Sequence, residues 1–441
     1  MTTENTYRVG FYTLGCKVSQ YETEAIAEAF AADGFLRAPF DEVCDVYVIN
    51  TCTVTAESDR KSRQVIRRAV HRNPHAVVMV CGCYAQTSPA AVAGIPGVAY
   101  VSGTDGKMRL PERARALLAD RTGVPYCEVT EIAGAAFERM SITHAPRTRA
   151  YLKIEDGCEC RCTYCAIPGA RGHVRSKPFS DVLREVETLA SGGCREIVLT
   201  GIETASYGVD LGNVRLIDLL EELDRRETTP RIRLGSLSPE LMREDFIRRF
   251  AALRCMVPHL HLSMQSGADA VLRGMRRRYH RSFALSALGA MRALVPAMQY
   301  TTDMMVGFPG ESDADFEETL DFCRQAKFLD MHVFAYSRRP GTPAATFPDQ
   351  VPEEVKHARS ARLIALNAEI RGEILSKVCR VGKPLSAVME SSEDGYVTGH
   401  TDTYMEVRVP DDGTMPSGTL LSLIPHSVDG AAILCEKNNL S

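Results

Sequence analysis

Short apolar runs alternate with amphipathic segments along most of this 441-residue chain. Apolar runs of about four to eight residues between turn residues are typical of strands, and the segments between them carry apolar residues at helical spacing. Strands that alternate with helices pair in parallel, because each helix carries the chain back across the sheet. The alternation therefore predicts an α/β protein with parallel sheets. The strand-like runs are residues 7–14, 45–50, 76–81, 151–154, 196–200, 231–235, 259–264, 301–306 and 332–336.

These runs fall into groups that predict separate domains. Residues 1–126 hold the first three runs and predict a small Rossmann-like α/β domain, and residues 127–148 read as a linker. Six strand–helix units within residues 149–375 fit a complete or partial TIM-like (βα) barrel, in which chemistry takes place on the loops after the strands. Residues 376–441 contain short alternating stretches separated by Gly, Pro and Asp, which predict a small antiparallel β-barrel.

Composition limits the compartment and the partners. The chain has 15 cysteines, and clustered thiols in a chain of this size indicate metal, iron–sulfur or redox chemistry before disulfides. No apolar run reaches about 18 residues and the first residues do not resemble a secretory signal, so we expect a cytoplasmic protein. The net charge is −4, so a nucleic-acid partner must be attracted by local groups of Lys and Arg.

Cys158, Cys162 and Cys165, here called the radical triplet, form a CxxxCxxC pattern in GCECRCTYCAIP after the first predicted barrel strand. Thiolates hold iron–sulfur clusters, and a 4Fe-4S cluster usually takes four, so three leave one iron open. An open iron can bind S-adenosylmethionine (SAM) and deliver an electron to its sulfonium, which releases a 5′-deoxyadenosyl radical. The alternative is a zinc site completed by Cys160, although zinc would prefer paired CxxC elements.

Cys16, Cys52 and Cys83, here called the N-terminal triplet, each lie within a few residues after one of the first three predicted strands. The carboxyl ends of the strands in an open α/β sheet face one crevice. Three cysteines far apart in sequence could therefore meet there. Cys81 lies two residues before Cys83 and would point the same way on a strand, so it is either a competing ligand or a buried strand residue.

The motifs around both triplets resemble those of the radical SAM methylthiotransferases, and the resemblance runs from end to end of the chain. TLGCKVSQYETE, INTCTVTAESDRKSRQ and GCYAQ are similar to the amino-terminal methylthiotransferase domain of that family. The motifs from RTRAYLKIEDGC to HVFAYSRRPGTPAA are similar to its radical SAM barrel, and about the last 65 residues resemble a TRAM domain. CKV and RTRAYLKI look like the subgroup that acts on threonylcarbamoyladenosine in tRNA.

The resemblance implies two 4Fe-4S clusters, one held by the radical triplet and a second held by the N-terminal triplet. It also implies two uses of SAM: one molecule methylates a sulfur on the second cluster, and another gives the radical that abstracts hydrogen, so that C–H becomes C–SCH3. Side-chain acids and bases cannot break an unactivated aromatic C–H bond, and the sulfur must lie within reach of the carbon radical. Both triplets should therefore face one cavity.

The implied function is methylthiolation of carbon 2 of threonylcarbamoyladenosine beside the anticodon of tRNA. The implied partners are the tRNA anticodon loop, an external electron donor and a sulfur source, with no membrane. Two alternatives keep the chemistry and change the substrate, to isopentenyladenosine in tRNA or to an aspartate of a ribosomal protein. An alternative from another class is an iron–sulfur RNA-binding sensor without turnover.

Seven residues are predicted from the resemblance to bind SAM, and each has a simpler explanation. Gly201 and Glu203, after the second barrel strand, would meet the methionine moiety or form an ordinary turn. Gln265 and Ser266 end the fourth strand, where ribose contacts are usual in the superfamily. The glycines of VGFPGE resemble the loop near adenine, although such loops also merely turn the chain. The predicted SAM-binding residues are Tyr164, Gly201, Glu203, Gln265, Ser266, Gly307 and Gly310.

Basic residues gather where they could meet RNA phosphates. One group crowds the predicted helix at residues 56–72, for which a solvated helix face is the alternative. A second follows the radical triplet and could hold substrate phosphates or the cofactor carboxylate, and a third follows the fourth barrel strand. The last domain is acidic overall, so it either has one local basic face or caps the cavity. The predicted tRNA-binding residues are Arg171, Arg175, Lys177, Arg276, Arg277 and Lys383.

Some residues depart from the family pattern or carry no assigned chemistry. Ser19 stands where asparagine is usual, and Glu159 and Cys160 replace a polar pair inside the radical triplet. Cys160 could be an extra redox-sensitive thiol. His259 and His261 lie on one side of one strand, and without matching ligands we expect them to line the barrel.

Overall fold

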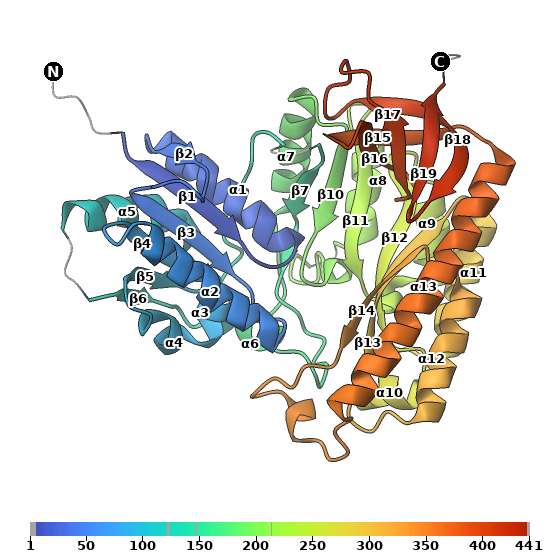
Figure 1. Ribbon diagram of the computed structural model, residues 1–441, viewed down its shortest axis with the longest axis horizontal. Coiled ribbons are helices and arrows are strands. Elements are labelled where there is room, and N and C mark those ends of the chain that lie inside the picture. The colour runs from blue at the N-terminus through green and yellow to red at the C-terminus, as the bar shows by residue number, and fades with distance from the viewer. Residues whose placement is uncertain (1–5, 121–123, 146–147, 213, 439–441) are drawn as a thin grey trace. The chain divides into compact units, whose positions relative to one another are not determined.

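The computed structural model of the protein describes residues 6–120, 124–145, 148–212 and 214–438 (Figure 1). The chain divides into two compact units. Unit 1 contains residues up to 142 together with 151–177 and 337–345, and unit 2 contains 143–150, 178–336 and the residues from 346 onward. Both units are discontinuous in sequence, so they do not test the predicted domain boundaries, which remain predictions. Within the described residues, no helix is both long and apolar enough to cross a membrane.

Unit 1 is built on a parallel sheet in the order β2-β1-β3-β4-β5-β6. The three predicted strands are β1, β3 and β4, which confirms the predicted α/β domain. The sequence reasoning missed the other three strands, two of which have only three residues. The strands are β1 (Arg8–Thr13), β2 (Leu36–Ala38), β3 (Val46–Thr51), β4 (Val77–Gly82), β5 (Val98–Ser102) and β6 (Tyr126–Glu128).

Helices cover both faces of this sheet (Figure 1). One face packs against α1 (Lys17–Ala32) and α5 (Leu110–Ala119) through buried residues such as Phe30 and Leu117. The other face packs against α2 (Ala56–Arg72), α3 (Cys83–Thr87) and α4 (Pro89–Ala93) through residues such as Ile66. Burial on two faces explains why the central strands are apolar throughout and do not alternate.

Two further pieces of chain complete unit 1. In the first, β8 (Glu155–Asp156) pairs with β9 (Arg175–Ser176), and α6 (Ile167–Arg171) lies between them in sequence. The second is the segment at residues 337–345, which contains all but the last residue of the short 3-10 helix at Pro343–Thr346. The chain passes from unit 2 to unit 1 within β7 (Ala150–Lys153), which matches another predicted strand.

Unit 2 contains a parallel sheet whose strands pair in sequence order from β10 to β14, as in a (βα) barrel. Every predicted strand from residue 196 to residue 336 is present, which confirms the partial barrel. The strands are β10 (Glu196–Thr200), β11 (Arg231–Leu237), β12 (Met256–Gln265), β13 (Gln299–Val306) and β14 (Asp330–Ala335). The helices are α7 (Phe179–Ser191), α8 (Leu216–Asp224), α9 (Glu244–Ala251), α10 (Asp269–Gly274), α11 (Arg281–Leu294) and α12 (Asp313–Ala326).

A long helix, α13 (Glu353–Val381), leads into a closed barrel in the order β15-β16-β17-β19-β18. Leu375 of α13 is buried in the core of this barrel. The predicted small barrel is confirmed, but its strands are not antiparallel throughout, because β17 and β19 pair in parallel. Its strands are β15 (Leu385–Glu393), β16 (Tyr396–Thr401), β17 (Glu406–Pro410), β18 (Leu420–Asp429) and β19 (Ala432–Lys437).

Candidate functional site

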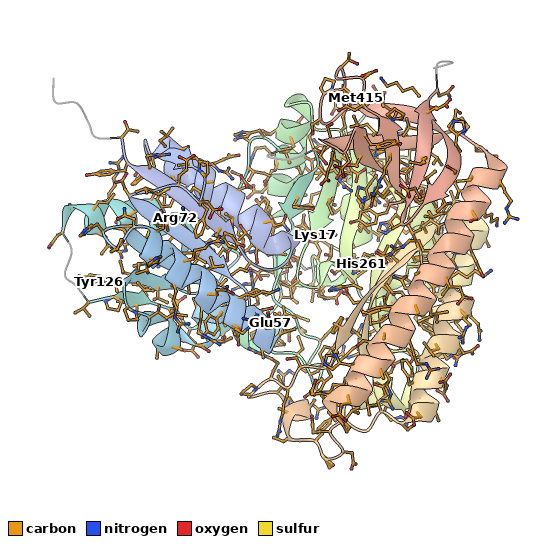
Figure 2. The ribbon with its side chains drawn as sticks, in the orientation of Figure 1. Lys17, Glu57, Arg72, Tyr126, His261 and Met415 are labelled. Carbon is orange, nitrogen blue, oxygen red and sulfur yellow. The ribbon has the colours of Figure 1, made fainter. Side chains whose placement is uncertain are left out.

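The N-terminal triplet lies at one edge of the unit 1 sheet, after three strands that are direct neighbours. Cys52 follows β3 and Cys83 follows β4, and Cys16 precedes α1 in the loop after β1. The label on Lys17 in Figure 2 marks the start of α1, one residue after Cys16. Parallel strands end at the same edge, so this placement follows directly from the strand order β1-β3-β4.

Their contacts bring the three thiols of the N-terminal triplet together. A Cβ placed on Gly15, next to Cys16, would lie 3.1 Å from Cβ and 3.3 Å from Sγ of Cys52. Burial, with repulsion from Cys83 and Cys16, raises the pKa of the Cys52 thiol to about 11. Burial also raises the pKa of Cys83, and Cys16 adds to that rise. The mutual effects of these thiols show that Cys16, Cys52 and Cys83 lie near one another.

The radical triplet lies on a loop whose two ends are tied together. Cys158 N–H donates to the Gly172 carbonyl at 3.1 Å, and β8 pairs with β9 just outside the loop. Gly157 has a φ of +86°, and a Cβ there would lie 1.9 Å from the His173 carbonyl oxygen, so only glycine fits at this crossing. Within the loop, Cys160 N–H donates to Cys158 Sγ at 3.3 Å.

Thiols of this kind can hold two kinds of metal group. A zinc site brings its ligands to one ion position. In a 4Fe-4S cluster each thiolate bonds a different iron, so its ligands are spread over the faces of the cluster. Three thiols on one loop, with the amide N–H of Cys160 directed at Cys158 Sγ, fit such a cluster.

Arg171 links the two loops within unit 1. It is the last residue of α6, which begins two residues after Cys165, and its Nε donates to Cys83 Sγ at 3.3 Å. Thr104 Oγ1 also donates to the Ala170 carbonyl at 2.8 Å, which fixes the end of α6 against the loop after β5. The helix that follows the radical triplet is therefore in contact with a cysteine of the N-terminal triplet.

A buried group of charges surrounds this contact. Glu22 is 0% exposed and accepts from Arg171 at 2.5 Å, while Lys107 Nζ and Lys153 Nζ each lie 2.8 Å from its carboxylate. Burial alone would raise the pKa of Glu22, but Arg171 and the two lysines hold it well below the ordinary value. Asp156 accepts from Lys153 at 2.5 Å and from Arg171 at 3.1 Å. These pairs keep the loop of the radical triplet fixed to α1.

The segment at residues 337–345 contacts both loops as well. Arg339 Nη2 donates to Thr53 Oγ1 at 2.7 Å, one residue after Cys52, and Arg339 Nη1 lies 2.8 Å from Asp59. Further along the segment, Ala344 N–H donates to the carbonyl of Thr163, between two cysteines of the radical triplet. This segment was part of a motif in the sequence, but its spacing gave no indication of these partners.

In unit 2, Glu203 and Gln265 occupy special environments. Burial raises the pKa of Glu203 to about 6, although its carboxylate accepts from Ser238 N–H at 3.0 Å. Gln265 has a φ of +68° at the end of β12, and its buried Oε1 has no hydrogen-bond partner among the described residues. A strained residue with an unpartnered polar atom is typical of a binding site. Next to it, Ser266 Oγ lies 3.3 Å from Thr319 Oγ1.

The other residues predicted to bind SAM have mixed environments. Gly307 N–H and Phe308 N–H both donate to the Glu311 carboxylate, and Gly310 N–H donates to the Asp349 carbonyl at 2.9 Å, so this loop is closed by its own contacts. Burial raises the pKa of Glu311 to about 7 despite the nearby Arg359. Gly201 is buried after β10, and Tyr164 is half-buried in unit 1.

His259 and His261 line one face of the sheet in a chain of hydrogen bonds. Thr301 Oγ1 lies 3.0 Å from His259 Nε2 and 2.9 Å from His261 Nδ1. Asp303 then joins His261 Nε2 and His332 Nδ1, both at 3.2 Å. Figure 2 labels His261 on this sheet. The imidazoles are thus held by protein partners across β12, β13 and β14, as expected for residues that line the barrel.

Three of the residues predicted to bind tRNA are buried. Arg171 faces Glu22 and Cys83, Arg175 Nη2 donates to the Arg171 carbonyl at 3.0 Å, and Lys177 Nζ donates to Tyr21 and to the Met140 carbonyl. In the structure these side chains balance buried carboxylates or satisfy buried carbonyls, and their binding of tRNA stays a prediction.

The remaining three residues predicted to bind tRNA lie in unit 2. Arg276 and Lys383 are exposed, while Arg277 is half-buried and donates to the Ser263 carbonyl at 2.9 Å.

Two further cysteines, Cys81 and Cys160, lie close in sequence to the triplets. Cys81 is fully buried in β4 among the residues that face α1 and α5, and burial raises its pKa to about 12. It is therefore a strand residue of the core. Cys160 is half-buried and its carbonyl accepts from Cys162 N–H at 2.6 Å. Ser19 is buried on α1, with Oγ 3.9 Å from Cys16 Sγ.

Sequence reasoning missed the residues that hold the two loops together. None of Glu22, Lys107, Lys153 or Asp156 was singled out, although each is almost completely buried. The only signal was the charged run KIED directly before the radical triplet. A charged residue between apolar strand residues indicates a buried pair, but not its partner.

Comparison with known proteins gives a consistent result. Residues 152–323 match the radical SAM superfamily, and residues 8–103 match the family described as Uncharacterized protein family UPF0004. The chain is 43% identical over 406 residues to the threonylcarbamoyladenosine tRNA methylthiotransferase MtaB of Bacillus subtilis (strain 168), covering 90% of this chain and 89% of that protein. It is 37% identical over 418 residues to a tRNA-2-methylthio-N(6)-dimethylallyladenosine synthase of Acidothermus cellulolyticus, covering 92% and 81%.

The fold is also similar to that of TsrM, a radical S-adenosylmethionine methyltransferase from Kitasatospora setae whose structure contains cobalamin and a 4Fe-4S cluster. The TM-score is 0.57 at 17% identity over 77% of each chain. Membership of the radical SAM superfamily implies one 4Fe-4S cluster and SAM. Similarity over most of two chains, together with the radical SAM match, shows that this protein belongs to the family of radical SAM methylthiotransferases.

Proposed function

We propose that this enzyme methylthiolates carbon 2 of threonylcarbamoyladenosine beside the anticodon of tRNA. The observation that carries the substrate assignment is the 43% identity to a protein named for this substrate, against 37% to one named for dimethylallyladenosine. A tRNA substrate also makes the cytoplasm the expected location. The proposal includes an external electron donor and a sulfur source as partners.

The radical triplet would hold the SAM-binding 4Fe-4S cluster, and the N-terminal triplet would hold a second one. Their supporting contacts are the amide N–H directed at Cys158 Sγ and the convergence of Cys16, Cys52 and Cys83. When bound, these clusters supply the radical and carry the sulfur that replaces hydrogen. The protein itself would fix both loops through Arg339 and through the buried Glu22 group, to which Arg171 belongs.

Side chains of unit 2 would bind SAM. Gln265 offers an unpartnered amide oxygen at the end of β12, and Glu203 offers a buried carboxyl whose pKa is raised by burial to about 6. Gly201 and Ser266 lie beside these two residues, and Gly307 and Gly310 would let the backbone approach adenine. Tyr164 would act from the radical triplet loop.

Exposed cations would attract the tRNA. Arg276 and Lys383 are exposed, and Arg277 is partly so. On α2, Lys61 and Arg67 are also exposed, and this helix begins four residues after Cys52. Figure 2 labels Glu57 and Arg72 at its two ends. Phosphate contacts of this kind position RNA without reading its sequence.

The test is turnover by the reconstituted full-length protein with a reductant and SAM. Separate reactions contain tRNA bearing threonylcarbamoyladenosine, tRNA bearing isopentenyladenosine, and ribosomal protein. We expect the methylthio group by mass spectrometry only on threonylcarbamoyladenosine. A product on either other substrate would replace the substrate assignment. Intact clusters without any 5′-deoxyadenosine would favour a sensor.

A further inference from the structure

We infer that Arg171 is a positioning residue for the second cluster: its guanidinium holds Cys83 by an N–H···S hydrogen bond and raises the reduction potential of the cluster on that thiolate. The inference rests on the proposed second cluster. It assigns Arg171 a role that its position in the chain does not indicate, because the residue follows the other triplet in sequence.

The geometry of Arg171 supports a fixed contact. The side chain is 0% exposed, and its three nitrogens are divided among different partners. Nη1 and Nη2 donate to the Glu22 carboxylate at 2.5 and 3.2 Å, and Nη1 also reaches Asp156, which leaves Nε directed at Cys83 Sγ at 3.3 Å. A guanidinium is a rigid planar fork, so fixing two of its nitrogens also fixes the direction of the third.

Arg171 belongs to a buried group of charges beside Cys83. Buried ion pairs join two carboxylates, Glu22 and Asp156, to four cations. Glu138 adjoins Lys107, and Glu155, next to Asp156 in sequence, is also completely buried. Buried charge is stable only when it is paired. The four cations are Lys107, Lys153, Arg171 and Arg175.

A cluster bound by three thiolates would carry a net negative charge next to Arg171. Reduction adds one more electron, so a fixed buried cation and a hydrogen bond to the ligand sulfur stabilise the reduced state more than the oxidised state. Hydrogen bonds to sulfur and net charge are established determinants of iron–sulfur potentials. Arg171 should therefore raise the reduction potential of this cluster above the value that a buried cluster without this arginine would have.

The experiment isolates the second cluster in the full-length chain by replacing the radical triplet with Ala. In this parent we compare Arg171→Gln and Arg171→Lys by redox titration followed by EPR. For Arg171→Gln we expect at least a tenfold lower ratio of reduced to oxidised cluster at fixed potential, which is about 59 mV for one electron. Arg171→Lys keeps the charge and should recover part of this ratio. Equal potentials in all three proteins would overturn the inference.

A matched control tests whether any nearby arginine has this effect. Arg63 donates to the Tyr84 hydroxyl at 3.0 Å, one residue after Cys83, but it has no contact with sulfur among those described. Arg63→Gln should leave the potential unchanged. A shift equal to that of Arg171→Gln would show that any nearby positive charge produces the effect, and it would contradict a role for the N–H···S bond.

A second measurement detects the contact of Arg171 in the parent protein itself. The parent protein is labelled with 15N-arginine, and pulsed EPR of the reduced cluster should show a hyperfine coupling to 15N that Arg171→Lys loses. Failure to see this coupling in a parent with an intact cluster would overturn the inference while leaving the second cluster in place. A parent that binds no iron would instead overturn the second cluster, and the inference with it.

Discussion

Glu22 is the residue on which the buried charge of unit 1 converges. Its carboxylate is shared by Lys107, Lys153 and Arg171, and none of the four side chains is more than 2% exposed. Charges of this kind are costly to bury, and they are tolerated only while every partner is present. The group fixes α1, the loop after β5 and the loop of the radical triplet to one another.

Replacing Glu22 with Gln should therefore destabilise unit 1. The change keeps the shape and removes the charge, which leaves buried cations uncompensated, and we expect a loss of about 3–5 kcal/mol. Urea unfolding followed by hydrogen exchange of α1 amides would measure it. Glu24→Gln is the matched control on the same helix: Glu24 pairs with the exposed Arg37, so its loss should stay within about 1 kcal/mol. Equal losses would contradict a special role for the buried pairs.

At the level of elements, strands β12 to β14 are joined by side chains as well as by their backbone. Asp303 on β13 accepts from histidines on both neighbouring strands, and these contacts outweigh burial and lower its pKa. The hydrogen bond to Asp303 in turn raises the pKa of His332, whose side chain is 77% exposed. This exposed imidazole is therefore held by a carboxylate and keeps its proton to higher pH than a free histidine.

Asp303→Asn should return the pKa of His332 toward its usual value near 6.5. A raised native pKa stabilises the fold below the unfolded pKa, and the stabilisation is lost as pH rises through the native value. The Asp303→Asn variant should therefore not show this loss of stability as pH rises. NMR titration of the histidines measures the pKa, with the exposed His75 on unit 1 as an internal control that does not move. An unchanged His332 would show that Asp303 does not hold its proton.

At the level of the whole molecule, neither compact unit is a continuous stretch of sequence. Unit 1 takes residues from three separate stretches, and two of them, 151–177 and 337–345, come from the region that sequence reasoning assigned to the barrel. Both thiol triplets consequently belong to one unit, and the predicted residues that would bind SAM, apart from Tyr164, belong to the other. A fragment of residues 1–126 would lack Lys153 and Arg171, two of the three cations paired with Glu22, and Arg339, which donates to Thr53.

Two clusters in the full chain predict about eight iron atoms per chain, and Ala in place of either triplet should leave about four. Cys162→Ala should abolish 5′-deoxyadenosine formation, whereas Cys52→Ala should keep some of it and lose sulfur insertion. Iron analysis and chromatography of the products measure both. Cys127→Ala, at an exposed cysteine of β6, is the control and should retain all iron. Equal loss of cleavage in both variants would argue against separate roles.

Much of the architecture could be predicted from the sequence because it depends on local patterns. The strand-like runs were read from short apolar stretches, and the positions of Cys16, Cys52 and Cys83 after three strands followed from those runs. Parallel pairing then brings their ends to one edge. The CxxxCxxC spacing is likewise local, since a loop closed by Gly157 positions its own cysteines.

The partners of the charged residues could not be predicted, because packing sets them over long separations. Arg171 is 88 residues from Cys83 and 149 from Glu22, and Arg339 is 286 from Thr53. A basic residue after the radical triplet gives the same sequence signal whether it meets phosphate or a buried carboxylate. The sequence by itself determined the central strands of unit 1, the strands of the partial barrel, the thiol positions and the family. Only the tertiary structure decided that Arg171, Arg175 and Lys177 point inward, because desolvated charges must find partners wherever the fold brings them.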